Sequence, residues 1–376
     1  MKRTKTLFSG VWALILLGAA SVQAQTARDT PFVTGADLSY LPYYESAGIK
    51  YTDGGKEMTL LAIARQNGWK IIRVRLWVNP GTDPKACVSD LAHVTALGKR
   101  IKAAGFEFLL DFHYSDTWAD PGHQIKPAAW TDLSFPDLVQ KVHDYSRDCI
   151  VHLIQNGARP DLVQIGNETR NGLLAGDAVR PGGGFWEADK AGMGRAAQLL
   201  AAGLAGVQDA APKHPPLTMI HVPDGQSTGF VKWYFPALAE AARTAHPPVL
   251  LRYDIIGLSY YPGIPWDHKA GYEPWHLSHL AASMEYIAAV LHKPVMVVET
   301  SWPQASSAAD VTGIPEFAFT PAGQVEFYTA LIHAVRAVPS GLGRGVLLWE
   351  SDTLNWDSVF DARGHALPAV HVLGNQ

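Results

Sequence analysis

The chain has 376 residues, of which 47% are hydrophobic and 18% are charged, so it holds enough apolar side chains for a large buried core. It carries 31 Lys and Arg against 35 Asp and Glu, a formal net charge of −4. This acidic balance argues against nucleic acid as a partner.

The first 24 residues have the pattern of a secretory signal peptide. A basic start is followed by an apolar run over residues 7–20 and by small residues that end at Ala24. Cleavage there gives a signal peptide over 1–24 and one domain over 25–376, and it implies export to the periplasm or the medium. The apolar run is too short for a membrane anchor, so we expect no membrane contact after cleavage. The mature chain, without the three N-terminal basic residues, holds 28 Lys and Arg against 35 Asp and Glu, a balance of −7.

Strand and helix patterns alternate along the rest of the chain. Runs rich in Val, Ile and Phe predict strands at 32–39, 70–77, 106–113, 162–168, 216–221, 255–260, 294–300 and 345–350. Amphipathic stretches predict helices at 56–67, 88–104, 135–156, 187–210, 229–245, 275–291 and 321–337. Eight strands that alternate with helices, without a linker or a repeat, predict a single (β/α)8 TIM barrel. A doubly wound α/β sheet is the alternative, but no glycine-rich phosphate loop follows the first strand.

The two cysteines, Cys87 and Cys149, could form one disulfide in an exported protein. They lie in successive predicted helices, and we favour the bridge although the sequence leaves it open. No Cys/His cluster has zinc spacing. Asp111, His113 and Asp116 could be drawn as a metal site, but we interpret the first two as hydrogen-bonded pocket residues on one strand. The sequence therefore predicts neither a metal nor a cofactor.

Two of the predicted strands end abruptly in a carboxylate, at Glu168 and at Glu299. The carboxyl end of a barrel strand is where barrel enzymes place their chemistry. Two carboxylates on separate strands suffice to break a glycosidic bond, if one is a protonated acid and the other a charged nucleophile or base. Each glutamate alone could simply cap its strand and face water.

Other polar and aromatic side chains occur at the same ends of the predicted strands. A lone buried Arg could neutralise a core carboxylate and a lone Tyr could pack, but packing does not explain so many at one face. The chain has 12 Trp and 13 Tyr, and aromatic faces stack well on sugar rings, although we assign most of them to the core. These strand-end residues include Arg73, Arg75, Asp111, His113, Asn167, His221, Ser259, Tyr260, Tyr261, Trp302, Trp349 and Glu350.

Several short sequence motifs around these residues together resemble glycoside hydrolase family 53, the arabinogalactan endo-β-1,4-galactanases, within clan A of the retaining glycosidases. The resemblance spans about residues 35–371. The word His-Tyr-Ser-Asp-x-Trp-Ala-Asp-Pro, at 113–121, is specific, whereas the Asn-Glu pair at 167–168 is common to the whole clan. Similar words stand at 73–80, 164–169, 259–262 and 298–301.

The resemblance implies that Glu168 is the acid/base and Glu299 the nucleophile of an exported enzyme, a monomer, that cuts the β-1,4-galactan of plant cell-wall pectin. Arg73 or Arg75 would hold the charge of Glu299, and Tyr260 or Tyr261 would lie beside it. Asn167 would bind the sugar 2-hydroxyl. The cleft would be lined by His113, Trp118, Asp120, Trp302 and Trp349.

The chain departs from the family in two places. Trp302 stands where a Tyr is common, and the segment over 349–360 is short, whereas several bacterial relatives have a long loop there that holds calcium. We therefore expect no calcium site. Two alternatives stay open: a clan A enzyme that acts on another β-1,4 backbone such as mannan or cellulose, and an inactive sugar-binding barrel.

Overall fold

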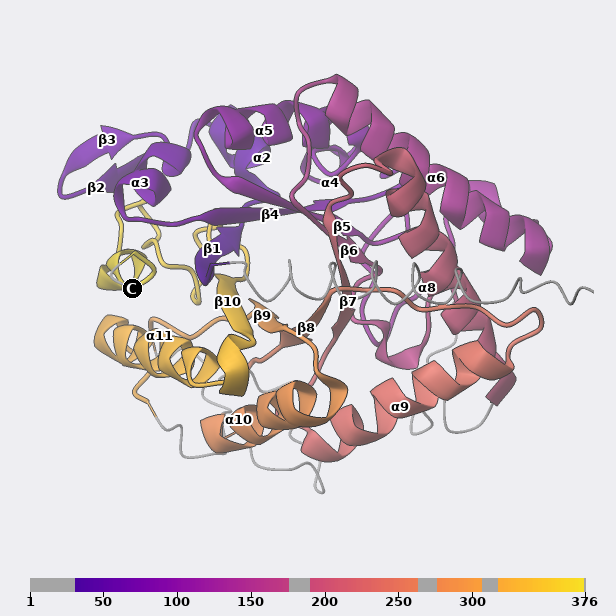
Figure 1. Ribbon diagram of the computed structural model, residues 1–376. Coiled ribbons are helices and arrows are strands. Elements are labelled where there is room, and N and C mark those ends of the chain that lie inside the picture. The colour runs from indigo at the N-terminus through magenta and orange to yellow at the C-terminus, as the bar shows by residue number, and fades with distance from the viewer. Residues whose placement is uncertain (1–30, 176–189, 263–275, 306–316, 375–376) are drawn as a thin grey trace, which may run out of the picture.

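The computed structural model describes residues 31–175, 190–262, 276–305 and 317–374. Parallel strands form a closed barrel in the order β1, β10, β9, β8, β7, β6, β5, β4 (Figure 1). The (β/α)8 fold predicted from the sequence is confirmed. The strands are β1 (Val33–Asp37), β4 (Ile71–Leu76), β5 (Glu107–Phe112), β6 (Leu162–Ile165), β7 (Leu217–Val222), β8 (Ile255–Ser259), β9 (Val295–Glu299) and β10 (Gly343–Leu348).

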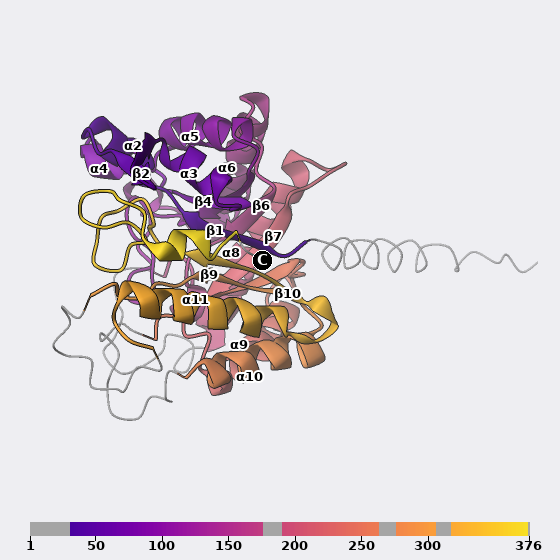
Figure 2. The ribbon, with the colours of Figure 1, turned by 90° about the vertical axis from the view of Figure 1, so that its left-hand side faces the viewer.

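Helices surround the barrel, with α5 and α6 on one side and α9, α10 and α11 on the opposite side (Figure 2). Side chains cap several of these helices at their N-termini, because Asp90, Ser134 and Thr320 each accept a backbone N–H at the start of their helix. The helices between the barrel strands are α3 (Leu60–Gln66), α5 (Leu91–Ala103), α6 (Phe135–Gln155), α8 (Lys190–Ala210), α9 (Thr228–Thr244), α10 (Leu277–Tyr286) and α11 (Pro321–Arg336).

Alternation along each strand separates two apolar layers. On β4, Ile72, Val74 and Leu76 pack outward against the helices, whereas Ile71 joins a small cluster inside the barrel. The next inward positions on β4 are Arg73 and Arg75, which are completely buried. The interior is thus apolar at the amino end of the strands and charged toward their carboxyl ends, where the predicted site lies.

The first predicted helix, over 56–67, is wrong in its first part. Residues Lys56–Met58 form strand β3, which pairs with β2 (Tyr51–Asp53) in an antiparallel hairpin. Thr59 then caps α3, and Gly54 and Gly55 at the turn have positive φ angles of 56° and 78°. The Gly-Gly pair was the signal for this hairpin. A short helix, α2 (Leu41–Ser46), also precedes the hairpin.

The favoured disulfide does not form, and both cysteines are free thiols. Cys87 ends a short helix, α4 (Pro84–Cys87), within the loop after β4 rather than lying in α5. Cys149 is buried in the second half of α6, and burial raises the pKa of its thiol to about 12. Because Cys87 lies in this loop helix, the expectation that the two cysteines occupy successive helices of the barrel is wrong.

Candidate active site

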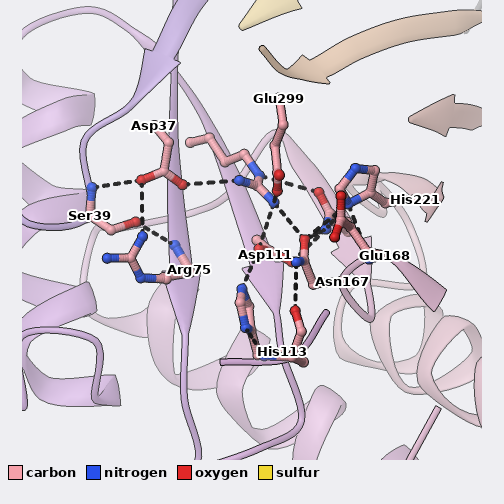
Figure 3. A network of polar contacts seen from close by, with 12 residues as sticks. Asp37, Ser39, Arg75, Asp111, His113, Asn167, Glu168, His221 and Glu299 are labelled. Carbon is pink, nitrogen blue, oxygen red and sulfur yellow. Dashed lines mark hydrogen bonds and ion pairs between the residues drawn. The ribbon is translucent and has the colours of Figure 1, made fainter. Parts of the chain in front are cut away.

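Arg73 is the centre of a buried network at the carboxyl ends of the strands. Its Nη1 donates to Asp37 at 3.1 Å, and its Nη2 lies 2.7 Å from Asp111 and 2.7 Å from Glu299. Figure 3 shows these three acids converging from three strands. A guanidinium surrounded by carboxylates stays charged, so the site has one fixed positive charge at its floor.

Glu299 ends β9 and contacts this charge as closely as Asp111 does. Its Oε1 accepts from Arg73, and its Oε2 accepts from the hydroxyl of Tyr261 at 3.0 Å. Burial raises the pKa of Glu299 to about 7, against the opposing pull of the Arg73 guanidinium. The sequence left Arg73 and Arg75 open as partners of Glu299, and the structure selects Arg73.

Glu168 follows β6 after a sharp turn. Gly166 has a φ of 75°, and Glu168 itself has a φ of 45°, a left-handed conformation that is rare for a residue with a side chain. Its Oε1 accepts from the Ser259 hydroxyl at 2.6 Å. Burial raises the pKa of Glu168 well above its usual range, and the nearby Glu299 raises it further. Glu168 therefore keeps its proton more readily than Glu299, which has Arg73 beside it.

The two glutamates face one another. One oxygen of Glu168, one oxygen of Glu299 and one ring nitrogen of His221 lie within 4.8 Å of each other. Such a triad could be drawn as a metal site, but the Arg73 guanidinium at 2.7 Å from Glu299 would repel a cation. His221 also has both ring nitrogens in hydrogen bonds, with Nε2 at 2.8 Å from Ser259. The donor set therefore suits proton and sugar chemistry better than metal binding.

Asn167 and His113 support the network from β6 and β5. Asn167 accepts from Arg73 at 2.9 Å and donates to the carbonyl of Ala119 at 2.8 Å, which fixes the orientation of its amide. His113 Nδ1 accepts from the Ala119 N–H, so its proton is on Nε2, which lies 3.0 Å from Asp111. Burial would raise the pKa of Asp111, but Arg73 and His113 lower it below its usual range. Asp111 and His113 are thus pocket residues, as interpreted from the sequence, while Asp116 accepts two backbone N–H groups in the loops nearby.

Arg75 lies apart from the glutamates and among aromatic rings. Its guanidinium carbon is 4.0 Å from the ring centroid of Tyr40 and 4.3 Å from that of Trp118. Its Nη1 donates to Glu350 at 3.0 Å. Trp118 and Trp349 are only partly buried, and their ring centroids are 5.8 Å apart. These two indoles are available to a ligand at the mouth of the barrel.

Three other residues of the predicted site are placed less centrally. Asp120 closes its own loop by accepting from the backbone of Gly122 and contacting His123, although its charge still acts on Glu168. Tyr260 is buried, with its ring packed toward Phe327 of α11, so of the two tyrosines it is Tyr261 that reaches Glu299.

Trp302 is also buried rather than open to the cleft. Its indole N–H donates to the carbonyl of Ala318 at 3.0 Å, and its ring stacks on Phe327 at 4.7 Å. Only 1% of the residue is exposed, so in this structure it offers no face to a sugar.

Asp37 and Gln164 belong to the network but were not named from the sequence, and Ser259 was named there only as a strand-end residue. Gln164 joins Arg73, Asp111 and Asn167, with its amide nitrogen 2.7 Å from Asp111. Residues an even number of positions apart on a strand point to the same side, and Gln164 stands four positions before Glu168 on the predicted strand, so this alternation was the signal that could have found it. Asp37, two positions before the end of the predicted strand 32–39, carried the same signal.

Comparisons with known proteins agree with this arrangement. Residues 33–373 match the sequence profile of glycosyl hydrolase family 53. The chain is 35% identical to an arabinogalactan endo-beta-1,4-galactanase of Cellvibrio japonicus over 95% of this chain and 94% of the relative. It is 33% identical to one of Thermothelomyces thermophilus over 84% of this chain and 88% of the relative.

Two solved structures share the fold over nearly the whole chain. One belongs to a study of two fungal beta-1,4-galactanases, with a TM-score of 0.77 and 31% identity over 92% of this chain and 99% of that one. The other is a GH53 catalytic domain of Ignisphaera aggregans, with a TM-score of 0.75 and 28% identity over 91% and 95%. A match of this extent to the family profile and to these relatives shows that the chain belongs to glycosyl hydrolase family 53.

Proposed function

We propose that the protein is an arabinogalactan endo-β-1,4-galactanase in which Glu168 is the acid/base and Glu299 the nucleophile. The observation that carries this assignment is the unequal environment of two facing glutamates. Arg73 and Tyr261 stabilise a negative charge on Glu299, whereas burial and the charge of Glu299 favour a proton on Glu168. Matched acid and nucleophile roles require this difference.

The spacing of the pair supports retention of configuration. Oxygens of the two glutamates lie within 4.8 Å, close to the roughly 5–5.5 Å typical of retaining enzymes and short of the roughly 6.5–9.5 Å that leaves room for a water in inverting ones. Glu299 attacks the anomeric carbon as Glu168 gives its proton to the departing oxygen. Glu168 then takes a proton from water, and that water oxygen displaces Glu299 from the anomeric carbon.

The substrate is β-1,4-galactan, which the named relatives support by their activity. Trp118 and Trp349 form an aromatic wall at the mouth of the barrel and stack on sugar rings. Asn167 binds the 2-hydroxyl beside the scissile bond. Arg75 packs against both indoles of the wall and fixes their positions. His113 and Asp120 shape the same wall. Tyr260 and Trp302 support it from behind.

The protein works outside the cytoplasm as a monomer, with a signal peptide over 1–24 and the barrel domain over 25–376. The basic start, apolar run and small residues before Gln25 support export and the signal peptide, although they lie outside the described residues. Within the described ranges, none of the helices has the length and apolar character needed to span a bilayer.

The test is a hydrolysis assay of purified protein on unbranched β-1,4-galactan, β-1,4-mannan and cellulose. We expect galacto-oligosaccharides of several lengths from galactan, with the β-anomer released first as seen by proton NMR. If oligosaccharides are released faster from mannan or cellulose than from galactan, then that polysaccharide, and not galactan, is the substrate. Binding of galactan without any release of reducing ends would instead favour an inactive sugar-binding barrel.

A further inference from the structure

Ser259, the last residue of β8, lies between the two glutamates and a histidine. Its Oγ is 2.8 Å from His221 Nε2, 2.6 Å from Glu168 Oε1 and 3.4 Å from Glu299 Oε2. The residue is 2% exposed, so protein groups rather than bulk water decide where its hydroxyl points. Figure 3 shows Glu168 and His221 side by side in this part of the site.

The direction of the hydrogen bond from His221 is set by its other nitrogen. Nδ1 accepts the backbone N–H of Glu168 at 3.3 Å and faces the amide nitrogen of Gln164 at 3.0 Å. The Asn167 Oδ1 is 2.9 Å away, but it already accepts from Arg73 and Gln164. Burial and Arg73 hold the pKa of His221 well below its usual range, so the ring is neutral and has one proton. That proton is on Nε2 and is donated to Ser259 Oγ.

A hydroxyl that accepts from His221 must direct its own proton elsewhere. Two carboxylates are within reach, and Glu168 Oε1 at 2.6 Å is much closer than Glu299 Oε2 at 3.4 Å. Glu299 Oε2 also accepts from Tyr261 already. Ser259 therefore donates to Glu168 Oε1, and an oxygen that accepts this bond does not hold the acid proton.

We propose that Ser259, oriented by His221, is a positioning residue that selects which oxygen of Glu168 carries the catalytic proton. With Oε1 occupied, the proton is held on Oε2, which receives no hydrogen bond from any residue in the described ranges and is free to meet the glycosidic oxygen. The first step moves this proton from Oε2 to the leaving oxygen as the C–O bond breaks and the bond to Glu299 forms. In the second step water returns a proton to Oε2 while its oxygen displaces Glu299. This inference rests on the proposed acid/base role of Glu168.

Ser259→Ala is the direct test, with galactan and a nitrophenyl galactoside as substrates. Without the bond to Oε1 the acid proton is shared between both oxygens and the carboxyl also loses the contact that fixes its orientation, so we expect kcat on galactan to fall about tenfold or more with KM within about twofold. The nitrophenyl substrate, whose leaving group needs little acid, should lose much less in the rate of its first step.

The pH profile gives a second readout. The Ser259 hydroxyl stabilises ionised Glu168 and so lowers its pKa, and its removal should move the alkaline limb of kcat/KM to higher pH. The other groups that face Glu168 are Glu299, Asp224, Asp120 and the neutral His221, and the variant keeps them all. Ser259→Thr, which keeps a hydroxyl, should return the limb toward its wild-type place.

Ser146→Ala is the matched control, because Ser146, on α6, is another fully buried serine and its hydroxyl bonds that of Tyr114 rather than a glutamate. It should leave kcat and the alkaline limb unchanged. Equal losses on both substrates after Ser259→Ala, or an unmoved alkaline limb, would overturn the inference.

If Ser259→Ala does not fold, as judged by circular dichroism, His221→Leu replaces it. It removes the donor that orients Ser259, so we expect the galactan-specific loss of kcat. Equal losses on both substrates there would likewise overturn the role of Ser259. An inactive wild-type protein would instead contradict the proposed function itself, which separates the two failures.

Discussion

At the scale of single residues, the site gives two identical side chains different chemistry through their neighbours. Arg73 and Tyr261 contact Glu299 but not Glu168, while Ser259 makes its short bond to Glu168. Glu299 is buried and Glu168 half-buried, which raises the pKa of each, and the fixed guanidinium decides which of them ionises first. The roles follow from this local asymmetry.

Glu299→Ala should lower turnover of galactan by about three orders of magnitude or more, because a covalent nucleophile is lost. Azide should partly restore the rate on an activated galactoside and give a product of inverted configuration, since the small anion takes the vacant place. Initial rates and NMR of the products measure both effects. Glu326→Ala, an exposed glutamate on α11, is the control. A Glu299→Ala variant that keeps more than about a tenth of the wild-type rate would contradict the assignment of Glu299 as the nucleophile.

Glu168→Gln should nearly stop galactan hydrolysis while nitrophenyl galactoside still forms the glycosyl-enzyme. The galactan chain leaves as a basic alkoxide that needs an acid, whereas nitrophenolate does not. Deglycosylation, which needs Glu168 as a base, becomes slow, so rapid-mixing kinetics should show a burst of nitrophenolate. Equal losses on both substrates without a burst would make Glu168 a binding or structural residue.

Tyr261→Phe should move the acid limb of the pH–activity profile to higher pH. The hydroxyl of Tyr261 stabilises ionised Glu299 and so lowers its pKa, and its loss lets Glu299 stay protonated to higher pH. Activity needs Glu299 ionised, so the variant should lose most at low pH and recover as the pH rises. A profile of kcat/KM against pH measures this, and an unmoved acid limb would exclude Tyr261 as a partner of the nucleophile.

At the scale of the element, a β-bulge aims Glu299 into the site. Between β8 and β9, Leu258 pairs with Val297 but Ser259 pairs with Glu299, so Val298 is an extra residue on β9. Val298 points into the barrel cluster, and simple alternation would then turn Glu299 outward. The extra residue returns Glu299 to the side of Arg73. Gly257 on β8 leaves space for Val298, since a Cβ there would be 3.1 Å from its side chain.

Helix α8 offers a matched pair of glycines that tests its packing on the barrel. A Cβ at Gly203 would be 2.7 Å from Ile165 and 2.8 Å from the Tyr114 hydroxyl, whereas one at Gly194 would meet nothing within 4 Å. Alanine gains about 1 kcal/mol of helix propensity over glycine at both sites, but overpacking costs about 1–3 kcal/mol.

Gly203→Ala should therefore lower the free energy of unfolding by up to about 2 kcal/mol, and Gly194→Ala should raise it by about 0.5–1 kcal/mol. Urea denaturation followed by circular dichroism measures both. Equal changes in the two variants would show that α8 does not lie as close to β6 as in this structure.

At the scale of the whole molecule, closure of the barrel brings residues more than 200 positions apart into one network, as Arg73 and Glu299 are. Arg73 offsets part of the negative charge of Asp37, Asp111 and Glu299 at its centre, and its guanidinium would repel an added cation. Activity should accordingly persist in excess EDTA. The assay is galactan hydrolysis before and after chelation, and activity that falls in EDTA and returns with calcium would contradict this.

The sequence by itself determined the barrel, the ends of its strands and the two glutamates, because strand periodicity and the sequence motifs of the family are local properties of the chain. It did not find the hairpin at 51–58, since a short amphipathic run fits either a helix or a strand.

Only the tertiary structure decided which arginine and which tyrosine meet Glu299, that Trp302 is buried, and that Ser259 joins His221 to Glu168. It also left as free thiols the two cysteines that the chain order had suggested were bridged. Side-chain direction depends on strand register, on a bulge and on packing against distant elements, and no local pattern encodes these.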